Sequence, residues 1–276
     1  MKKYFFASIF LFVILLFVIP PATLSSDLGN TLLTVVAFLF GIIAGFYIII
    51  TTTDYNSLKS TLAQEAAALI SLYQNLCIYD RSYAQKLTPL IDKYVRRNFD
   101  FELIDYMRET EPEFIEIERA IEEIPFYHDK AEVFQGVHTI KNNLTNARQY
   151  LYVLGTHTLS GFQWGVLITL SLIFIGSLYS VRTGSVFFDV VTVALSGSVV
   201  LVLLLIKDLD RYVWNEQTFG FDILQNVLRT IGELPYYPAE SLEDGRVVPR
   251  EKEYRVGTFV GSGESRSRKI EVRKVS

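Results

Sequence analysis

Apolar residues divide this chain into two pairs of hydrophobic stretches separated by a long charged segment. Each stretch is close to the roughly 20 residues that a helix needs to cross a bilayer, and at most one charged residue interrupts it. The pattern therefore predicts a membrane protein with four transmembrane helices and a polar helical domain inserted between the second and the third. The four expected spans are Tyr4 to Ile19, Thr31 to Ile50, Phe162 to Tyr179 and Phe187 to Ile206.

The first stretch fits two interpretations. Lys2 and Lys3, the apolar run and the small polar residues that follow it also resemble a cleaved secretory signal. Pro20 and Pro21 stop a helix abruptly, however, and no Ala-x-Ala site follows them. We therefore expect residues 4–19 to be retained as a span, with cleavage as the alternative.

The distribution of Lys and Arg predicts how the spans are oriented. Lys2 and Lys3 precede the first span, Lys59 follows the second and Lys207 follows the fourth, whereas residues 20–30 contain neither Lys nor Arg. Positive charge accumulates on the cytoplasmic side of membrane proteins. Both termini and the long insert are therefore expected in the cytoplasm, with the protein in the plasma (inner) membrane.

One charge opposes this pattern, because Arg182 lies in the short turn between the third and fourth spans. Asp189 follows one or two helical turns later and is the only ionisable residue within the four apolar stretches. We expect the two to form a charge pair near the outer surface.

The inserted segment, residues 54–160, has the periodicity of a helical bundle. Asp54 is placed to cap a helix that continues from the second span with only a kink. Further helices are predicted from Arg81 to Phe99, where Pro89 bends the helix or sets its first turn, and from His128 to Leu154. A further apolar stripe runs from Glu113 to Ile124. The apolar residues that recur at helical spacing in the first helix and in this stripe are Leu58, Leu62, Leu69, Leu72, Leu76, Phe114, Ile117, Ile121 and Ile124.

A strongly acidic region lies within the insert. Ten acidic residues stand against two arginines between Asp100 and Glu123. We interpret them as the solvated outer face of a helix. The alternative is a cation-binding rim, although the spacing matches no calcium loop. That rim would consist of Glu116, Glu118, Glu122 and Glu123.

The C-terminal region divides into an amphipathic segment and a basic segment. Residues 207–240 are expected to run along the membrane as a cytoplasmic amphipathic segment with a helix from Phe221 to Ile231. Residues 241–276 predict either a β-hairpin, with strands at Val256 to Val260 and Ile270 to Val275, or a flexible tail. Nine Lys and Arg stand against four Glu in residues 245–276, which suits either anionic headgroups or simple solubility.

Composition and missing motifs exclude several classes of function. Half of the residues are hydrophobic and the net charge is −4, which does not suit a nucleic-acid-binding protein. A single cysteine, Cys77, permits no intrachain disulfide, and the three histidines are too scattered for a metal site. Phosphate-binding loops, hydrolase nucleophile elbows and metalloprotease helices are missing from the sequence. We expect neither an enzyme nor a cofactor.

The second span carries a more specific signal. Phe38, Ile42 and Phe46 recur every four residues and therefore share one face of the helix. Repeated around a symmetry axis, such a face forms a hydrophobic pore neck, although apolar residues in a span also simply face lipid. Gly41 and Gly45 form the Gly-x-x-x-Gly spacing that lets helices pack closely.

Two further strings resemble the bestrophin-like family of bacterial four-span proteins, which is distantly similar to the bestrophin anion channels. They are Glu65-Ala66-Ala67-Ala68-Leu69-Ile70-Ser71-Leu72-Tyr73, and Leu209-Asp210-Arg211-Tyr212-Val213-Trp214 through Leu234-Pro235-Tyr236-Tyr237-Pro238. The resemblance covers roughly residues 31–238. It implies a homo-oligomer, pentameric in bestrophins, with the second span around a central pore and anions as permeant ions.

The leading hypothesis is therefore a passive anion channel in the lipid bilayer, with Phe38, Ile42 and Phe46 as its neck. The alternative is a membrane scaffold or signalling protein that does not conduct and whose cytoplasmic bundle binds a partner.

Overall fold

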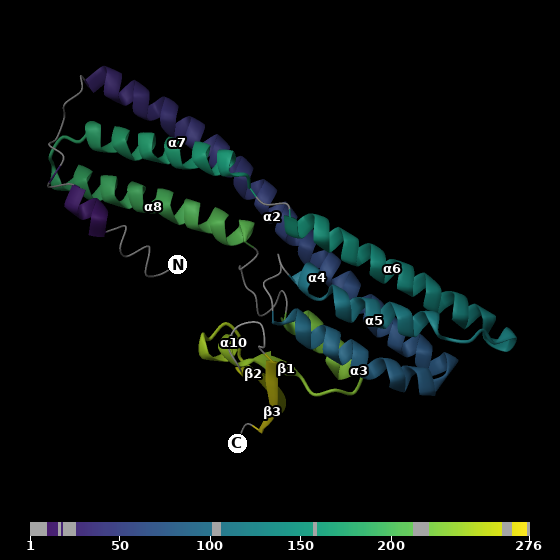
Figure 1. Ribbon diagram of the computed structural model, residues 1–276. Coiled ribbons are helices and arrows are strands. Elements are labelled where there is room, and N and C mark those ends of the chain that lie inside the picture. The colour runs from purple at the N-terminus through teal and green to yellow at the C-terminus, as the bar shows by residue number, and fades with distance from the viewer. Residues whose placement is uncertain are drawn as a thin grey trace. The chain divides into compact units, whose positions relative to one another are not determined.

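The computed structural model describes residues 10–15, 18, 26–100, 106–156, 159–211, 221–260 and 267–274, which form helices and one small sheet (Figure 1). In chain order the elements are α2 (Ser26–Tyr79), α3 (Arg81–Asn98), α4 (Tyr106–Glu109), α5 (Glu111–Glu122), the 3-10 turn η1 (His128–Lys130), α6 (Ala131–Thr156), α7 (Gly161–Ser180), α8 (Val186–Asp210), α9 (Asp222–Thr230), β1 (Tyr236–Pro238), α10 (Ala239–Glu243), β2 (Glu253–Val260) and β3 (Ser267–Lys274).

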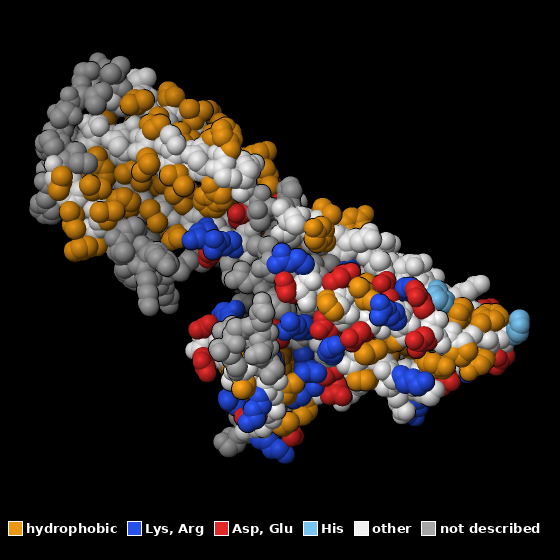
Figure 2. Space-filling model, in the orientation of Figure 1, with side chains coloured by type: hydrophobic (Ala, Val, Ile, Leu, Met, Phe, Trp, Pro, Cys, Tyr) orange, Lys and Arg blue, Asp and Glu red, His pale blue; other side chains and the backbone are white. Residues whose placement is uncertain are grey.

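The chain divides into two compact units. The first, residues 1–55 and 158–212, is called the membrane unit here because it holds the most apolar helices. The second, residues 56–157 and 213–276, is called the polar unit. Hydrophobic side chains cover the helices of the membrane unit, whereas Lys, Arg, Asp and Glu gather on the polar unit (Figure 2).

Three helices among the described residues are long and apolar enough to cross a membrane: α2, α7 and α8. They correspond to the second, third and fourth predicted spans. Most of the first predicted span, Tyr4 to Ile19, lies outside the described residues. Within that span, residues 10–15 are described and are helical. Ser160 and Gln163 form a reciprocal capping box at the start of α7, and Ser185 caps α8.

The membrane unit is held together by an apolar core between its three helices, which run alongside one another in Figure 1. The Phe40 ring of α2 stacks on Phe174 of α7 at 5.6 Å between centroids. Without a hydrophobic driving force in lipid, such close contacts are what hold membrane helices together. The fully buried members of this core are Phe40, Ala44, Leu167, Val199 and Ile206.

In the polar unit, the predicted apolar stripes are buried as expected. The five leucines of α2 named above are all buried, and so are Phe114, Ile117 and Ile121 of α5 and Ile124 just after it. The helix continues from the second span, as expected, but Asp54 does not cap it, because no new helix begins there. The helix α2 runs unbroken from Ser26 to Tyr79, because neither Pro nor Gly occurs near Asp54 to interrupt it.

The next helix, α3, begins at Arg81 as predicted, and only the expectation that Pro89 sets its first turn needs correction. Asp80 caps α3 by accepting a hydrogen bond from the Ser82 N–H at 2.8 Å. Pro89 lies well inside α3 and does not set its first turn.

The C-terminal sheet confirms the predicted hairpin and adds a strand. The strands β2 and β3 pair antiparallel, from Glu253 opposite Lys274 to Val260 opposite Ser267. The third strand, β1, pairs parallel with β2 and was not predicted. Gly257 is required in β2, because a Cβ at this position would collide with the Tyr236 side chain.

Candidate functional site

The predicted neck residues occupy a face of α2 that the rest of the described chain leaves uncovered. Phe38 is 67% exposed, Ile42 54% and Phe46 61%. Val36 and Phe40, by contrast, are buried against the membrane unit. A step of two residues rotates an α-helix by roughly 200°, so the exposed and buried sets lie on opposite sides.

Gly41 and Gly45 of α2 also face away from the core of the described residues. A Cβ built on Gly41 or on Gly45 meets no atom within 4 Å among the described residues. Close packing between helices, the usual reason for Gly-x-x-x-Gly in a span, is therefore not seen at these glycines among the described residues. Any helix that approaches these glycines must come from outside the described part of the chain.

Arg182 and Asp189 lie together between α7 and α8, with Nε and Oδ1 3.5 Å apart. The Arg182 side chain is only 3% exposed, and its guanidinium lies 5.5 Å from the centroid of the Tyr179 ring. The Tyr179 hydroxyl in turn donates to the Phe12 carbonyl at 2.7 Å. The pair is thus part of a buried polar cluster at this end of the spans.

Asp210 connects α7 and α8 at the opposite end of the same helices. Its carboxylate accepts hydrogen bonds from the Leu159 N–H at 2.7 Å and from the Trp164 indole N–H at 3.2 Å. The last residue of α8 therefore holds the start of α7 by two hydrogen bonds. An indole N–H usually finds a hydrogen-bond partner, and for Trp164 that partner is Asp210.

In the polar unit, a buried network of hydrogen bonds links α2, α3 and α6. The hydroxyl of Tyr94 donates to the carboxylate of Glu65 and accepts from Nη1 of Arg148 at 2.7 Å. Glu65 is fully buried and Arg148 nearly so. Burial, reinforced by the negative charge of Glu65, raises the pKa of Tyr94 well above its ordinary value, so the phenol remains protonated.

Arg148 extends this hydrogen-bond network from Tyr94 to Glu111 at the surface. Its Nη1 also donates to the Thr110 hydroxyl at 3.2 Å, while Nη2 donates to Glu111 Oε2 at 2.9 Å and Nε to the same oxygen at 3.3 Å. Its guanidinium lies 4.5 Å from the centroid of the Phe114 ring. One arginine therefore joins α2, α3 and α5 to α6.

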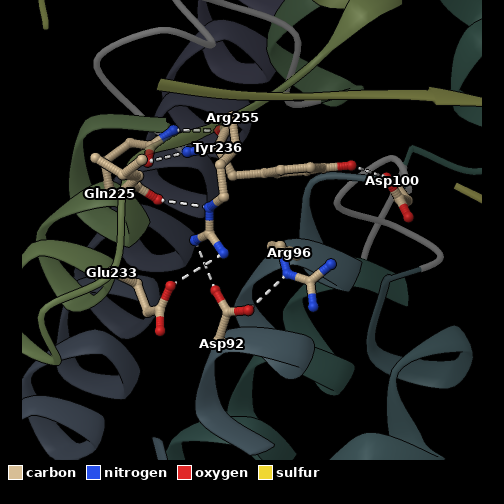
Figure 3. Close-up of polar contacts among 8 residues, drawn as sticks. Asp92, Arg96, Asp100, Gln225, Glu233, Tyr236 and Arg255 are labelled. Carbon is tan, nitrogen blue, oxygen red and sulfur yellow. Dashed lines mark hydrogen bonds and ion pairs between the residues drawn. The ribbon is translucent and has the colours of Figure 1, made fainter. Parts of the chain in front are cut away.

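A second arginine holds the C-terminal sheet against the helices (Figure 3). Nη2 of Arg255 lies 2.6 Å from Asp92 Oδ1, and Nη1 lies 3.3 Å from Glu233. Its Nε donates to the Leu234 carbonyl at 2.9 Å, and the other oxygen of Asp92 accepts from Arg96 at 2.8 Å. We call this cluster the Arg255 clamp.

Other polar contacts in Figure 3 fix β1 itself. The Gln225 side chain donates to the Tyr236 carbonyl and accepts from its N–H at 3.0 Å. The Tyr236 hydroxyl donates to Asp100 at 3.4 Å, and Arg268 lies 2.8 Å from the same carboxylate. Gln225 thus completes the hydrogen bonds of a strand that is only three residues long.

The basic tail is an ordered part of the polar unit over its described residues. Most of its cations pair with carboxylates of this chain, including Arg268 with Glu240 at 2.8 Å. Of the acidic region, Asp100 is buried in such a pair, whereas Glu111 and Glu122 of α5 are exposed. Across the described residues, no group of three or more His, Cys, Asp or Glu is arranged to hold a metal ion.

Comparisons with known proteins agree with this architecture. The sequence profile of the bestrophin-like domain matches residues 4–211. A crystal structure of a bacterial bestrophin homologue from Klebsiella pneumoniae is similar at 12% identity and a TM-score of 0.56, over 74% of this chain and 87% of that one. A crystal structure described as a membrane protein variant gives the same score and identity over 73% and 87%. No curated protein matches.

Proposed function

This chain belongs to the bestrophin-like family, and from that premise we propose that several copies surround a central ion pathway lined by α2. In this arrangement Phe38, Ile42 and Phe46 form a hydrophobic neck. The resemblance to bestrophins supports a passive anion channel and a pentamer.

The exposed stripe of α2 is the observation that supports this proposal most. Three large apolar side chains recur every four residues on the side of α2 opposite the core of its own unit. Around a symmetry axis they would approach one another and narrow the pathway. A ring of this kind controls ion flow by excluding water, and the positive edges of the phenylalanine rings favour anions over cations.

The glycines and the charge distribution fit the same assembly. Gly41 and Gly45 would allow a neighbouring subunit's helix to approach α2 closely. With Lys59 and Lys207 on the cytoplasmic side, the polar unit and both termini lie in the cytoplasm of a cell whose plasma membrane holds the channel. The Arg182–Asp189 pair then lies near the outer surface.

Currents through the full-length protein in liposomes test the proposal. Replacing Phe38, Ile42 or Phe46 with alanine widens the neck, so we expect the anion current to rise roughly threefold or more. Leu172→Ala and Phe187→Ala are matched controls, because both side chains are exposed on spans outside α2. Their currents should equal that of the wild type.

Two results would count against a channel. One is the absence of current from the wild type and from all three neck variants. The other is an equal change in the controls, which would mean that any exposed apolar residue in a span has this effect. In either case, the alternative of a scaffold whose polar unit binds a partner would be preferred.

A further inference from the structure

The polar unit contains a cavity of about 510 Å³ between α5 and the second half of α6. This volume lies within the range of roughly 300 to 1,000 Å³ that is usual for small-molecule sites. Its apolar walls include Phe114, Tyr152 and Val153, and its charged lining includes Arg108 and Arg148. Such a lining, apolar with a few placed charges, is typical of a site for a small organic ion.

The deepest charged group in this cavity is the guanidinium of Arg148, whose side chain is 4% exposed. Two of its nitrogens, Nη2 and Nε, donate to a single oxygen of Glu111. The Glu111 side chain, in contrast, is 54% exposed. The buried arginine is therefore covered by a surface carboxylate that can turn into solvent at little cost.

A carboxylate from a ligand can take the place of Glu111 on Arg148. Its two oxygens would accept from Nη2 and Nε in the bidentate geometry that guanidinium groups favour, which the single oxygen of Glu111 does not achieve. Meanwhile Nη1 stays bonded to Tyr94 and Thr110, so the guanidinium is held in a fixed orientation. Arg108 adds a second positive charge at the exposed rim.

The remaining lining restricts which anions fit. Glu118 also lines the cavity, and the Thr145 hydroxyl donates to its carboxylate at 2.9 Å. This fixed negative charge disfavours a dianion such as phosphate. The rings of Phe114 and Tyr152 favour a flat apolar body attached to the carboxylate.

We propose that this cavity binds a small aromatic monocarboxylate, whose carboxylate replaces Glu111 on Arg148 while its ring lies against Phe114 and Tyr152. All of these groups belong to the polar unit, so binding here does not depend on whether the chain conducts ions.

Fluorine NMR titration of the full-length protein in nanodiscs with 4-fluorobenzoate tests the site. We expect saturable binding of 4-fluorobenzoate and none of 4-fluorobenzamide, which has the same ring without the charge. Glu111→Gln removes the competing charge and should tighten binding about threefold to fivefold. Tyr152→Ala should weaken it by about threefold to tenfold through loss of ring contact.

Glu116→Gln is the matched control for Glu111→Gln, because Glu116 lies on the same helix but pairs with Lys93 at 2.9 Å outside the cavity. It should bind the probe like the wild type. A gain in affinity specific to Glu111→Gln does not arise from misfolding. The site would be rejected by an absence of saturable binding, by equal binding of the amide, or by equal affinities of the two glutamine variants.

Discussion

The two units of this protein are stabilised by different kinds of contact. The core of the membrane unit consists of apolar side chains, and polar groups hold its helices mainly at their ends, at Arg182 and Asp210. The polar unit, in contrast, contains two arginines, Arg148 and Arg255, that each join several elements through charged partners. The exposed surfaces differ in the same way, because the membrane unit leaves a row of large apolar residues on α2 uncovered.

This contrast indicates which side chains have partners within the described residues and which need partners from elsewhere. In the polar unit, buried charges find their partners within the chain, as low-dielectric surroundings demand. In the membrane unit, the side chains of Phe38, Ile42 and Phe46 remain largely exposed among the described residues. Something outside the described residues must cover them, and the proposed ring of copies would explain their regular spacing.

The largest effect is expected from breaking the Arg148 network. Arg148→Met leaves the fully buried Glu65 without its neighbouring cation, and removing one partner of a buried pair typically costs about 3 to 5 kcal/mol. Hydrogen exchange of the full-length protein in nanodiscs measures this cost as faster exchange of amides in α3 and α6. Amides of α7 and α8 should be unaffected.

Two further variants make this prediction specific. Arg119→Met, on the exposed surface of α5, should change exchange little. Adding Glu65→Gln to Arg148→Met should recover part of the lost protection, because the uncompensated charge is then gone. If the double variant is no better protected than the single one, the buried charge is not the cause.

A smaller effect is expected from the Arg255 clamp. Arg255→Met removes one partner of Asp92, but Arg96 still pairs with that carboxylate, so we expect a loss of about 1 to 3 kcal/mol. It should appear as faster exchange confined to β1 and β2. The matched control is Lys269→Met on β3, whose partner Glu271 is exposed and whose loss should be nearly silent.

Uniform loss of protection across the whole polar unit in Arg255→Met would show that the sheet and the helices unfold as one body. Unchanged protection of β2 would show that the clamp does not hold the sheet.

Much of the fold could be predicted from hydrophobic periodicity. The second, third and fourth spans, the leucine stripe of α2 and the apolar stripe of α5 are each encoded within one continuous segment. The hairpin of β2 and β3 was likewise predicted, because its two strands are close in sequence. Local pattern suffices where the partners of an element are its neighbours or a single apolar surface.

Contacts between distant segments were not predictable in this way. The strand β1 is only three residues long, too short for a pattern, and Asp92 and Arg255 are 163 positions apart. Similarly, Arg148 looks in sequence like any surface arginine of a helix. The excess of acid in residues 100–123 and of base after residue 245 was a hint that the two regions pair, as Asp100 and Arg268 do.

The proposed neck shows what cannot be predicted from the sequence of one subunit. Sequence periodicity placed Phe38, Ile42 and Phe46 on one face of α2, and the fold leaves that face exposed. What lies opposite these side chains depends on other molecules, which the sequence of one subunit does not specify.

Cysteine accessibility under current recording tests the lining role of α2 most directly. The single native cysteine, Cys77, is exposed, so the experiment starts from Cys77→Ser. In that background, a charged methanethiosulfonate reagent should block most of the current through Ile42→Cys and leave Leu172→Cys unchanged. Equal block of both, or no block of Ile42→Cys in a conducting protein, would contradict a pathway lined by α2.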